Sequence, residues 1–275
     1  MAAGLYVVAT PIGNARDVTL RALDVLKGCD VIACEDTRVT AKLLAIHGIS
    51  RPLVAYNDHN GPQMRPQILA RLDRGEAVAL VSDAGTPLVS DPGYKLVREV
   101  IGHGAPVIAI PGASAVLTGL ALSGLPSDRF LFAGFLSAKA GERATALEEL
   151  KGIRSTLIFF ESGPRLAETL AAMTEVLGNR PAVVARELTK LHEEARRGLL
   201  PQLAEHYAQA PTPKGEVTLL VGPPAQAEVD NAKVDAALKQ ALAFMPVKAA
   251  CEMIAGLTGE SRKALYDRAL DLKNE

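Results

Sequence analysis

The stretch Ser82-Asp83-Ala84-Gly85-Thr86-Pro87-Leu88-Val89-Ser90-Asp91-Pro92-Gly93 decides how this chain folds, because it carries a strand-like run into a helix through a loop of small residues. The run before it, residues 77–81, is apolar throughout, as in a covered strand. The residues after it, 94–101, repeat apolar side chains at helical spacing. The loop therefore lies at the carboxyl end of a strand, where open α/β sheets bind small ligands.

Strand and helix patterns alternate from residue 5 to about residue 122, and each predicted strand is followed by a helix. The strands are predicted at 5–9, 30–34, 52–56, 77–81 and 106–110. This alternation is typical of a parallel sheet with helical crossovers. We therefore predict an α/β fold whose first domain, residues 1–122, holds a parallel five-stranded sheet.

Turn residues without periodicity at 122–128 predict a domain junction. A second α/β domain, residues 123–224, is predicted beyond it. Its strands are expected at 130–135, 156–160, 182–186, 194–198 and 216–221, and its helices near 141–151, 165–177 and 200–209. Some of the connections are too short for helical crossovers, so we predict a mixed sheet.

Residues 225–275 are predicted to form a polar linker and a short helical tail. The tail has apolar positions from Val247 onward and a second helix from Ser261, which carries Arg262, Lys263 and Arg268. These basic side chains could contact RNA. The alternative is a helical hairpin that braces the domain or a dimer.

Composition excludes several classes of protein. A net charge of −1 over 275 residues excludes a strong overall field for nucleic acid, although a local basic patch is compatible with it. Three cysteines without metal-ligand spacing make a disulfide framework or a zinc site unexpected, so no metal is predicted. No apolar run reaches the roughly 18 residues of a membrane helix, and the N-terminus lacks the basic flank of a secretion signal. We expect a cytoplasmic protein.

Two further loops of small residues are predicted at the same sheet edge. Residues 8–14 follow the first strand, and their lone Gly13 matches neither the dinucleotide-binding nor the phosphate-binding glycine motif. Residues 110–115 follow the fifth strand and open a helix whose first backbone N–H groups are free to donate. Together with residues 82–93 these loops are expected to outline one ligand cleft; ordinary strand-to-helix turns are the alternative.

Seven strings of sequence stand in order along the chain: 8–14 (VATPIGN), 35–38 (EDTR), 82–87 (SDAGTP), 90–93 (SDPG), 110–114 (IPGAS), 159–162 (FFES) and 186–190 (RELTK). With these strings the chain resembles, over nearly its whole length, the bacterial 16S rRNA (cytidine) 2′-O-ribose methyltransferases of the tetrapyrrole methylase-like fold. The resemblance implies S-adenosylmethionine as methyl donor, a cytidine ribose in the decoding region of small-subunit rRNA or of the 30S subunit as acceptor, and a homodimer. One departure is Gly163-Pro164, where many relatives carry Pro-His.

By this resemblance, S-adenosylmethionine lies in a cleft between the two sheets. The implied cofactor-binding residues are Pro11, Ala84, Gly85, Leu88, Val89, Ser114, Ala115, Phe160, Leu188 and Gly215. A mostly apolar cleft with a few backbone polar groups suits an adenosine and a thioether. Asp83 could favour the sulfonium charge or could cap its own loop.

Polar strings at other strand ends supply the candidate catalytic residues. Asp36, His59 and Glu187 are candidates for accepting the proton of the ribose hydroxyl, and Arg38 and Lys190 are candidates for positioning it. An acid beside an arginine can instead be an ion pair or a helix cap, and a loop histidine can simply be solvated.

Two other functions stay open at this stage. One is a methyltransferase of the same fold that acts on a small tetrapyrrole, and the other is a noncatalytic RNA-binding module of ribosome assembly. Aromatic residues make up 4% of the chain, so base stacking is expected to be sparse and recognition to depend on RNA shape and backbone.

Overall fold

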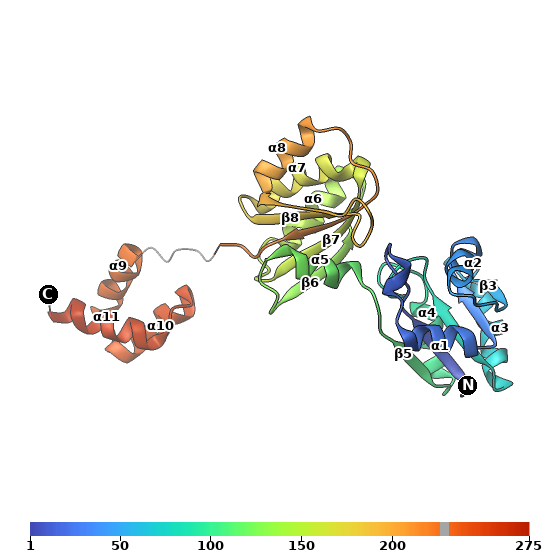
Figure 1. The fold of residues 1–275 in the computed structure, drawn as a ribbon. Coiled ribbons are helices and arrows are strands. Elements are labelled where there is room, and N and C mark those ends of the chain that lie inside the picture. Colours follow the sequence, from blue (N-terminus) through green and yellow to red (C-terminus); the bar gives the residue numbers. More distant parts are fainter. Residues whose placement is uncertain (226–230, 275) are drawn as a thin grey trace. The chain divides into compact units, whose positions relative to one another are not determined.

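The computed structural model describes residues 1–225 and 231–274, and the chain forms two compact units, Met1–Pro224 and Ala225–Glu275. The first unit holds two five-stranded sheets, each with its own helices (Figure 1). The second unit is helical. We call the parts built on the two sheets the first and second lobes.

The first sheet is parallel, as predicted. Its strands are β1 (Gly4–Val8), β2 (Val31–Cys34), β3 (Leu53–Ala55), β4 (Ala77–Val81) and β5 (Val107–Ile110), in the order β3-β2-β4-β1-β5. Every residue of β2 and β4 is buried. Such continuous apolar runs suit strands that are covered on both faces.

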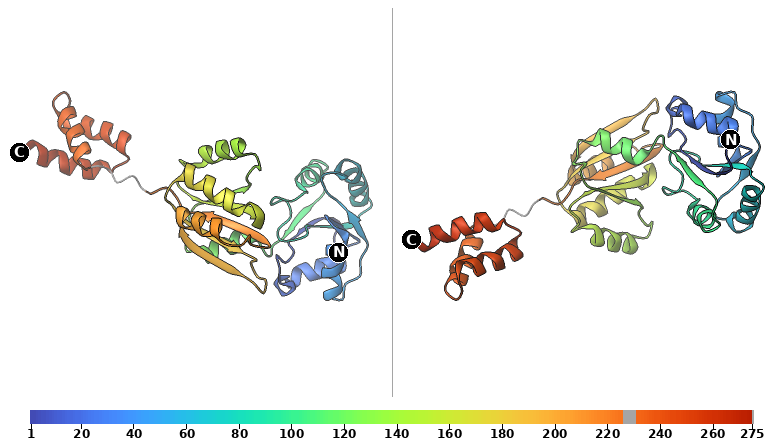
Figure 2. Two further views of the ribbon diagram at one scale, coloured as in Figure 1. Left: turned by 90° about the horizontal axis from the view of Figure 1, so that it is seen from above. Right: turned by 90° about the horizontal axis from the view of Figure 1, so that it is seen from below.

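Helices cover both faces of this sheet (Figure 2). The helices α1 (Leu20–Gly28) and α2 (Thr37–Ile46) pack against one face, and α3 (Gly61–Asp73) and α4 (Tyr94–Gly102) pack against the other. Successive side chains of a strand point to opposite faces, so each strand supplies both cores. A short 3₁₀ turn, η1 (Ala15–Asp17), precedes α1.

The second sheet is mixed, as predicted. Its strands are β6 (Phe130–Phe135), β7 (Thr156–Ser162), β8 (Pro181–Arg186), β9 (Glu194–Leu199) and β10 (Glu216–Val221). The order is β6-β7-β10-β8-β9, with β6 and β7 parallel and the other neighbours antiparallel.

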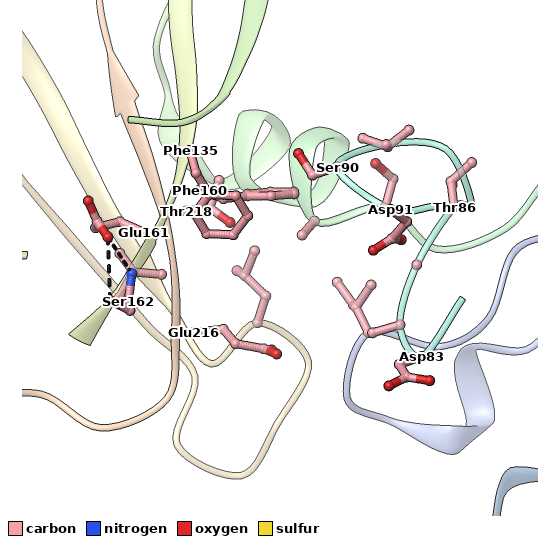
Figure 3. Close-up of a pocket in the computed structure, with 18 of the residues that line it drawn as sticks. Asp83, Thr86, Ser90, Asp91, Phe135, Phe160, Glu161, Ser162, Glu216 and Thr218 are labelled. Carbon is pink, nitrogen blue, oxygen red and sulfur yellow. Dashed lines mark hydrogen bonds between the residues drawn. The ribbon is translucent and has the colours of Figure 1, made fainter. Parts of the chain in front are cut away.

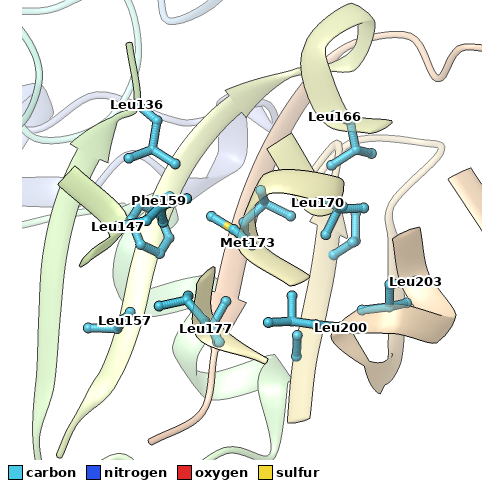
Figure 4. Close-up of a cluster of buried hydrophobic side chains, with 14 of the residues drawn as sticks. Leu136, Leu147, Leu157, Phe159, Leu166, Leu170, Met173, Leu177, Leu200 and Leu203 are labelled. Carbon is cyan, nitrogen blue, oxygen red and sulfur yellow. The ribbon is translucent and has the colours of Figure 1, made fainter. Parts of the chain in front are cut away.

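One face of the second sheet packs against α6 (Ala140–Leu150), α7 (Leu166–Leu177) and α8 (Leu200–Gln209). Figure 4 shows this core, in which Leu157 and Phe159 of β7 meet α7. A single turn, η2 (Gly163–Arg165), leads from β7 into α7.

The opposite face packs against α5 (Ala115–Ser123), which directly follows β5 of the first lobe. Val116 and Leu120 of α5 contact a cluster that includes Ile158 and Leu220 of the second sheet. The chain therefore crosses between the lobes at residues 111–114. The domain boundaries at 122–123 and 224–225 stay a prediction.

The second unit comprises α9 (Asn231–Leu242), α10 (Val247–Thr258) and α11 (Arg262–Asn274). The prediction of a polar linker up to the tail was wrong for α9, whose Val234 and Leu238 lie in the core of this unit with Ile254 and Leu265. Arg268, a candidate RNA contact, binds Asp235 at 2.7 Å. No helix within residues 1–225 and 231–274 is both long and apolar enough for a membrane span.

Candidate functional site

The loops after β1, β4 and β5 meet at one edge of the first sheet. Thr10 and Gly85 exchange backbone hydrogen bonds, with N···O distances of 2.8 and 3.1 Å. The Thr86 hydroxyl donates to the Ala113 carbonyl at 3.2 Å. Three loops that are far apart in sequence therefore form one surface, as the sequence predicts.

A cavity of about 450 Å³ lies between these loops and the second lobe (Figure 3). Its lining residues are Ile12, Glu35, Asp83, Ala84, Gly85, Thr86, Val89, Ser90, Asp91, Ser114, Ala115, Phe135, Phe160, Glu161, Ser162, Leu188, Gly215, Glu216, Val217 and Thr218. Small-molecule sites typically occupy roughly 300–1,000 Å³. The cavity therefore has the size of a site for one nucleoside-sized ligand.

Eight of the ten predicted cofactor residues line this cavity: Ala84, Gly85, Val89, Ser114, Ala115, Phe160, Leu188 and Gly215. Pro11 and Leu88 do not. Leu88 packs into the core between the first sheet and α4, and Pro11 is buried beside Ile12. The loop backbone explains why the neighbours Leu88 and Val89 differ. Leu88, whose φ is +75°, points into the core, whereas the side chain of Val89 faces the cavity.

An aromatic corner forms the apolar end of the cavity on the second lobe. The ring of Phe160 lies 4.8 Å from that of Phe132 and 5.6 Å from that of Phe135, both edge to face. The register of β6 against β7 shifts between Phe132 and Gly134, where Gly134 has φ +68°. This bulge brings Phe132 and Phe135, three residues apart, to the same face. No pattern in the sequence announces it.

Acidic side chains dominate the polar lining. Five of the lining residues are acidic, and none of the described lining residues is a lysine, arginine or histidine; of the five, Glu161 has its carboxylate buried against Thr169. On the first lobe these acids are Glu35, Asp83 and Asp91. Burial raises the pKa of each carboxyl group, and neighbouring acids raise it further. Figure 3 shows Asp83 and Asp91 opposite Phe160 and Glu216.

Glu187 and Lys190 lie just outside the cavity and hold its second-lobe rim. The Lys190 ammonium lies 2.9 Å from a carboxylate oxygen of Glu187 and 2.9 Å from one of Glu216. Glu187 also accepts a hydrogen bond from the Glu216 backbone N–H at 3.1 Å. These donors, Lys190 first, lower the pKa of Glu187.

Gly215 fits this rim because it has no side chain. Its φ is +90°, and a Cβ atom there would overlap the carboxylate of Glu187. Across the rim, the Asn14 backbone N–H donates to the Thr189 hydroxyl at 3.1 Å, so the loop after β1 contacts the loop after β8. The two loops close one side of the cavity.

Asp36 and Arg38 form the ion pair and helix cap that the sequence leaves as the alternative. Asp36 accepts from the Arg38 backbone N–H at 2.8 Å and binds the guanidinium at 2.6 Å. Hydrogen bonds from Arg38 lower the pKa of Asp36 to about 2. His59 lies exposed in the turn before α3, where its backbone N–H donates to Asn57 at 3.1 Å. None of the five candidate catalytic residues lines the cavity.

Glu161 lies at the end of β7, and its side chain is buried. It accepts hydrogen bonds from the Ser162 backbone N–H at 2.8 Å and from the Thr169 hydroxyl at 2.6 Å, and Arg165 lies 3.4 Å away. The departure at Gly163 has a steric reason, because a Cβ there would overlap the carbonyl of Pro213. No cluster of three or more metal-ligating side chains occurs in the described part of the chain.

Two family models match the chain. One, described as "Tetrapyrrole (Corrin/Porphyrin) Methylases", covers residues 4–204, and the other, described as "RsmI C-terminal HTH domain", covers residues 228–273.

Relatives match almost the whole chain. It is 56% identical over 272 residues to "Ribosomal RNA small subunit methyltransferase I" of Mesorhizobium japonicum, covering 98% of this chain and 92% of that protein. The protein of the same name from Erythrobacter litoralis is 55% identical over 270 residues, covering 98% and 95%.

Solved structures share the fold at low identity. Diphthine synthase superimposes with a TM-score of 0.63 at 17% identity, covering 79% of this chain and 89% of that chain. Uroporphyrin-III C-methyltransferase from Thermus thermophilus, complexed with S-adenyl homocysteine, superimposes with a TM-score of 0.56 at 21% identity. The match covers 80% of this chain and 97% of that chain. These likenesses confirm the predicted fold class.

Proposed function

This chain belongs to the tetrapyrrole (corrin/porphyrin) methylase family, and on that premise we propose that it methylates a ribose 2′-oxygen of a cytidine in the decoding region of small-subunit rRNA, with S-adenosylmethionine as donor. The names of relatives that are 55–56% identical over nearly the whole chain support rRNA as the acceptor. The choice of ribose and cytidine rests on the sequence strings quoted above. The observation that carries the proposal is the cavity formed by the three convergent loops.

The cavity suits S-adenosylmethionine in shape and in charge. Ile12, Val89, Leu188 and the Phe135–Phe160 corner offer apolar surface to an adenosine. Gly85, at φ +81°, lets the backbone approach a ligand closely. The carboxylates of the first lobe favour a cationic sulfonium over a neutral ligand.

When bound, S-adenosylmethionine supplies an activated methyl group whose carbon is attacked in line with the departing sulfur. The protein's own contribution is to hold donor and acceptor in that alignment, which is the main source of acceleration in such displacements. The Asn14–Thr189 hydrogen bond holds the loop after β1 against the loop after β8 beside the cavity.

The five candidate residues are proposed to act on the RNA at the mouth of the cavity. Arg38, 86% exposed at its side chain, and Lys190 are suited to phosphate or ribose contacts, and their partners Asp36 and Glu187 hold them in place. His59, also exposed, is placed with them as an RNA contact. The phosphates then stay at the rim while the sugar enters.

The same charge distribution disfavours a tetrapyrrole acceptor. Porphyrin precursors carry several carboxylates around the macrocycle, and the carboxylates of Glu35, Asp83 and Asp91 on the first-lobe side have no cationic partner among the described lining residues. Like charges at such short range are repulsive.

The proposal also includes a homodimer, a cytoplasmic location and RNA contacts by the helical unit, which matches a helix-turn-helix family model.

One experiment separates the three functions. Labelled S-adenosylmethionine is incubated with the protein and, in parallel, with unmodified 30S subunits, free small-subunit rRNA or a uroporphyrinogen-type macrocycle. We expect label in rRNA, at a cytidine 2′-oxygen when the RNA is digested to nucleosides. Label in the macrocycle would favour the tetrapyrrole enzyme. Failure to bind S-adenosylmethionine in calorimetry would leave the noncatalytic module.

A further inference from the structure

Glu35 differs from the other acids near the cavity in what surrounds its carboxylate. It directly follows β2, lines the cavity and is partly buried. Within the described residues, no lysine or arginine forms an ion pair with it and no side chain donates a hydrogen bond to it. Its one protein donor is the backbone of Asp83. Glu35 therefore keeps acceptor capacity for a ligand.

The other acids are already engaged. Asp36 is bound to Arg38, and Glu187 and Glu216 share Lys190. Glu161 is buried among Ser162, Thr169 and Arg165. A carboxylate bound by a cation is a weak proton acceptor, because protonation must give up that attraction.

Asp83 and Asp91 form no ion pair within the described part of the chain, but each stabilises the loop after β4. A carboxylate oxygen of Asp83 accepts the Asp36 backbone N–H at 3.0 Å and so ties the loop after β4 to the start of α2. Asp91 is held by the Ser82 side chain. Each of the three has one protein hydrogen-bond partner, but Glu35 has the longest side chain and follows β2 rather than lying within the loop after β4.

We propose that Glu35 is a catalytic residue that accepts the proton of the ribose 2′-hydroxyl, an inference that rests on the function proposed above. The ribose oxygen forms its bond to the methyl carbon while the carbon–sulfur bond breaks, and the bonding pair leaves on sulfur. The hydroxyl proton passes to a carboxylate oxygen of Glu35 and is later released to water. Atoms and charge balance, because the neutral hydroxyl and the cationic donor yield an ether, a thioether and one proton.

The surroundings of Glu35 raise its pKa above the ordinary value of 4.5. Burial of the carboxyl group has the largest effect, and the carboxylates of Asp83, Asp91 and Asp58 raise the pKa further. Asp36 and Arg38 stand next to Asp83 on the same side. A base with a raised pKa retains a proton more readily during the transfer.

The test compares Glu35→Gln, Glu35→Asp and the unchanged protein. Glu149→Gln, the same chemical change at an exposed position of α6, is the matched control. Three quantities are measured: the single-turnover methylation rate with 30S subunits at saturating S-adenosylmethionine from pH 5 to 9, the Kd of S-adenosylmethionine by calorimetry, and the melting temperature of the ligand-free protein.

We expect Glu35→Gln to lower the maximal rate by about 100-fold or more, the usual contribution of a general base. The Kd of S-adenosylmethionine should change far less than the rate. The unchanged protein should gain rate as pH rises through the pKa of Glu35, and Glu35→Gln should lose this limb. Glu35→Asp should keep the limb and more of the rate. Melting at or above the temperature of the unchanged protein excludes unfolding as the cause.

A Glu35→Gln protein that keeps its maximal rate or its pH limb would overturn the assignment. So would a rate loss that higher S-adenosylmethionine concentration restores, since that identifies a binding role. Failure of the unchanged protein to bind S-adenosylmethionine or to methylate 30S subunits would instead refute the proposed function.

Discussion

On the first-lobe wall of the cavity, Glu35, Asp83 and Asp91 form no ion pair with any residue that the structure describes, whereas on the second-lobe rim Glu187 and Glu216 share Lys190. The pKa values move in opposite directions as a result. Burial raises those of the first wall, while Lys190 lowers that of Glu187. The first wall is thus suited to a cation or a proton from a ligand, and the rim is a structural brace.

Gly215→Val should disrupt the contacts of Glu187 on the second-lobe rim and should have the largest effect on stability. The new side chain would need φ +90° and would displace the Glu187 carboxylate from Lys190 and from the Glu216 N–H. We expect a loss of about 3 kcal/mol in the free energy of unfolding, from strain and the lost contacts together. Urea denaturation measures this. Gly141→Val on the exposed start of α6, where a Cβ meets nothing, is the control. Equal losses of unfolding free energy in Gly215→Val and Gly141→Val would mean that disruption of the rim contacts is not the cause.

Phe135→Ala should remove one of the two aromatic side chains that line the cavity, both of which belong to the second lobe. Its ring packs edge to face on Phe160 at 5.6 Å and lines the cavity. An aromatic contact of about 1.4 kcal/mol corresponds to a tenfold weaker Kd for S-adenosylmethionine. Calorimetry checks it. Phe130→Ala, on the same strand but outside the cavity lining, should bind normally, and an unchanged Kd in Phe135→Ala would remove the corner from the cofactor site.

Lys190→Met should make the rim resemble the first wall, because Glu187 and Glu216 lose their common cation. The pKa of Glu187 is lowered in the folded protein, so its stabilising contribution is present above the unfolded pKa and is lost as pH falls through the folded pKa. We expect a loss of about 1 kcal/mol at pH 7, since Lys190 is partly exposed. The loss should shrink below pH 4. A loss of unfolding free energy that is equal at pH 7 and below pH 4 would instead indicate lost side-chain packing.

Asp91→Asn should give a small gain in stability at neutral pH, the opposite of the loss expected when the second-lobe rim is changed. The pKa of Asp91 is raised by burial first, then by Asp83, so the stability it contributes is present below the unfolded pKa and is lost as pH rises through the folded pKa. The variant should therefore melt slightly higher than the unchanged protein at pH 7.5, and the difference should vanish near pH 3. Differential scanning calorimetry at the two pH values decides. A lower melting temperature at pH 7.5 would show that the contact with Ser82 outweighs the charge.

Much of the fold follows from local patterns. The apolar runs at 31–34 and 77–81 and the alternating helices predict a parallel sheet, and the short connections predict the mixed one. The helix α9 was missed because its apolar residues are sparse in a polar sequence, and they become a core only against α10 and α11.

The loops that line the cavity were also predictable, since small residues at strand ends carry their own signal. Leu88 was misplaced because a single turn of the backbone at φ +75° decides whether a side chain faces core or cavity. Phe135 was missed because a bulge at Gly134 changes which face it occupies.

The sequence by itself determined the two sheets and the edge at which the loops gather, because side-chain periodicity and turn chemistry act over a few residues. Only the tertiary structure decided which carboxylates are free. Lys190 reaches Glu216 across 26 residues, and Asp83 reaches the Asp36 backbone across 47. A pKa depends on the charges and the burial within a few ångströms, and the folded chain alone sets those neighbours.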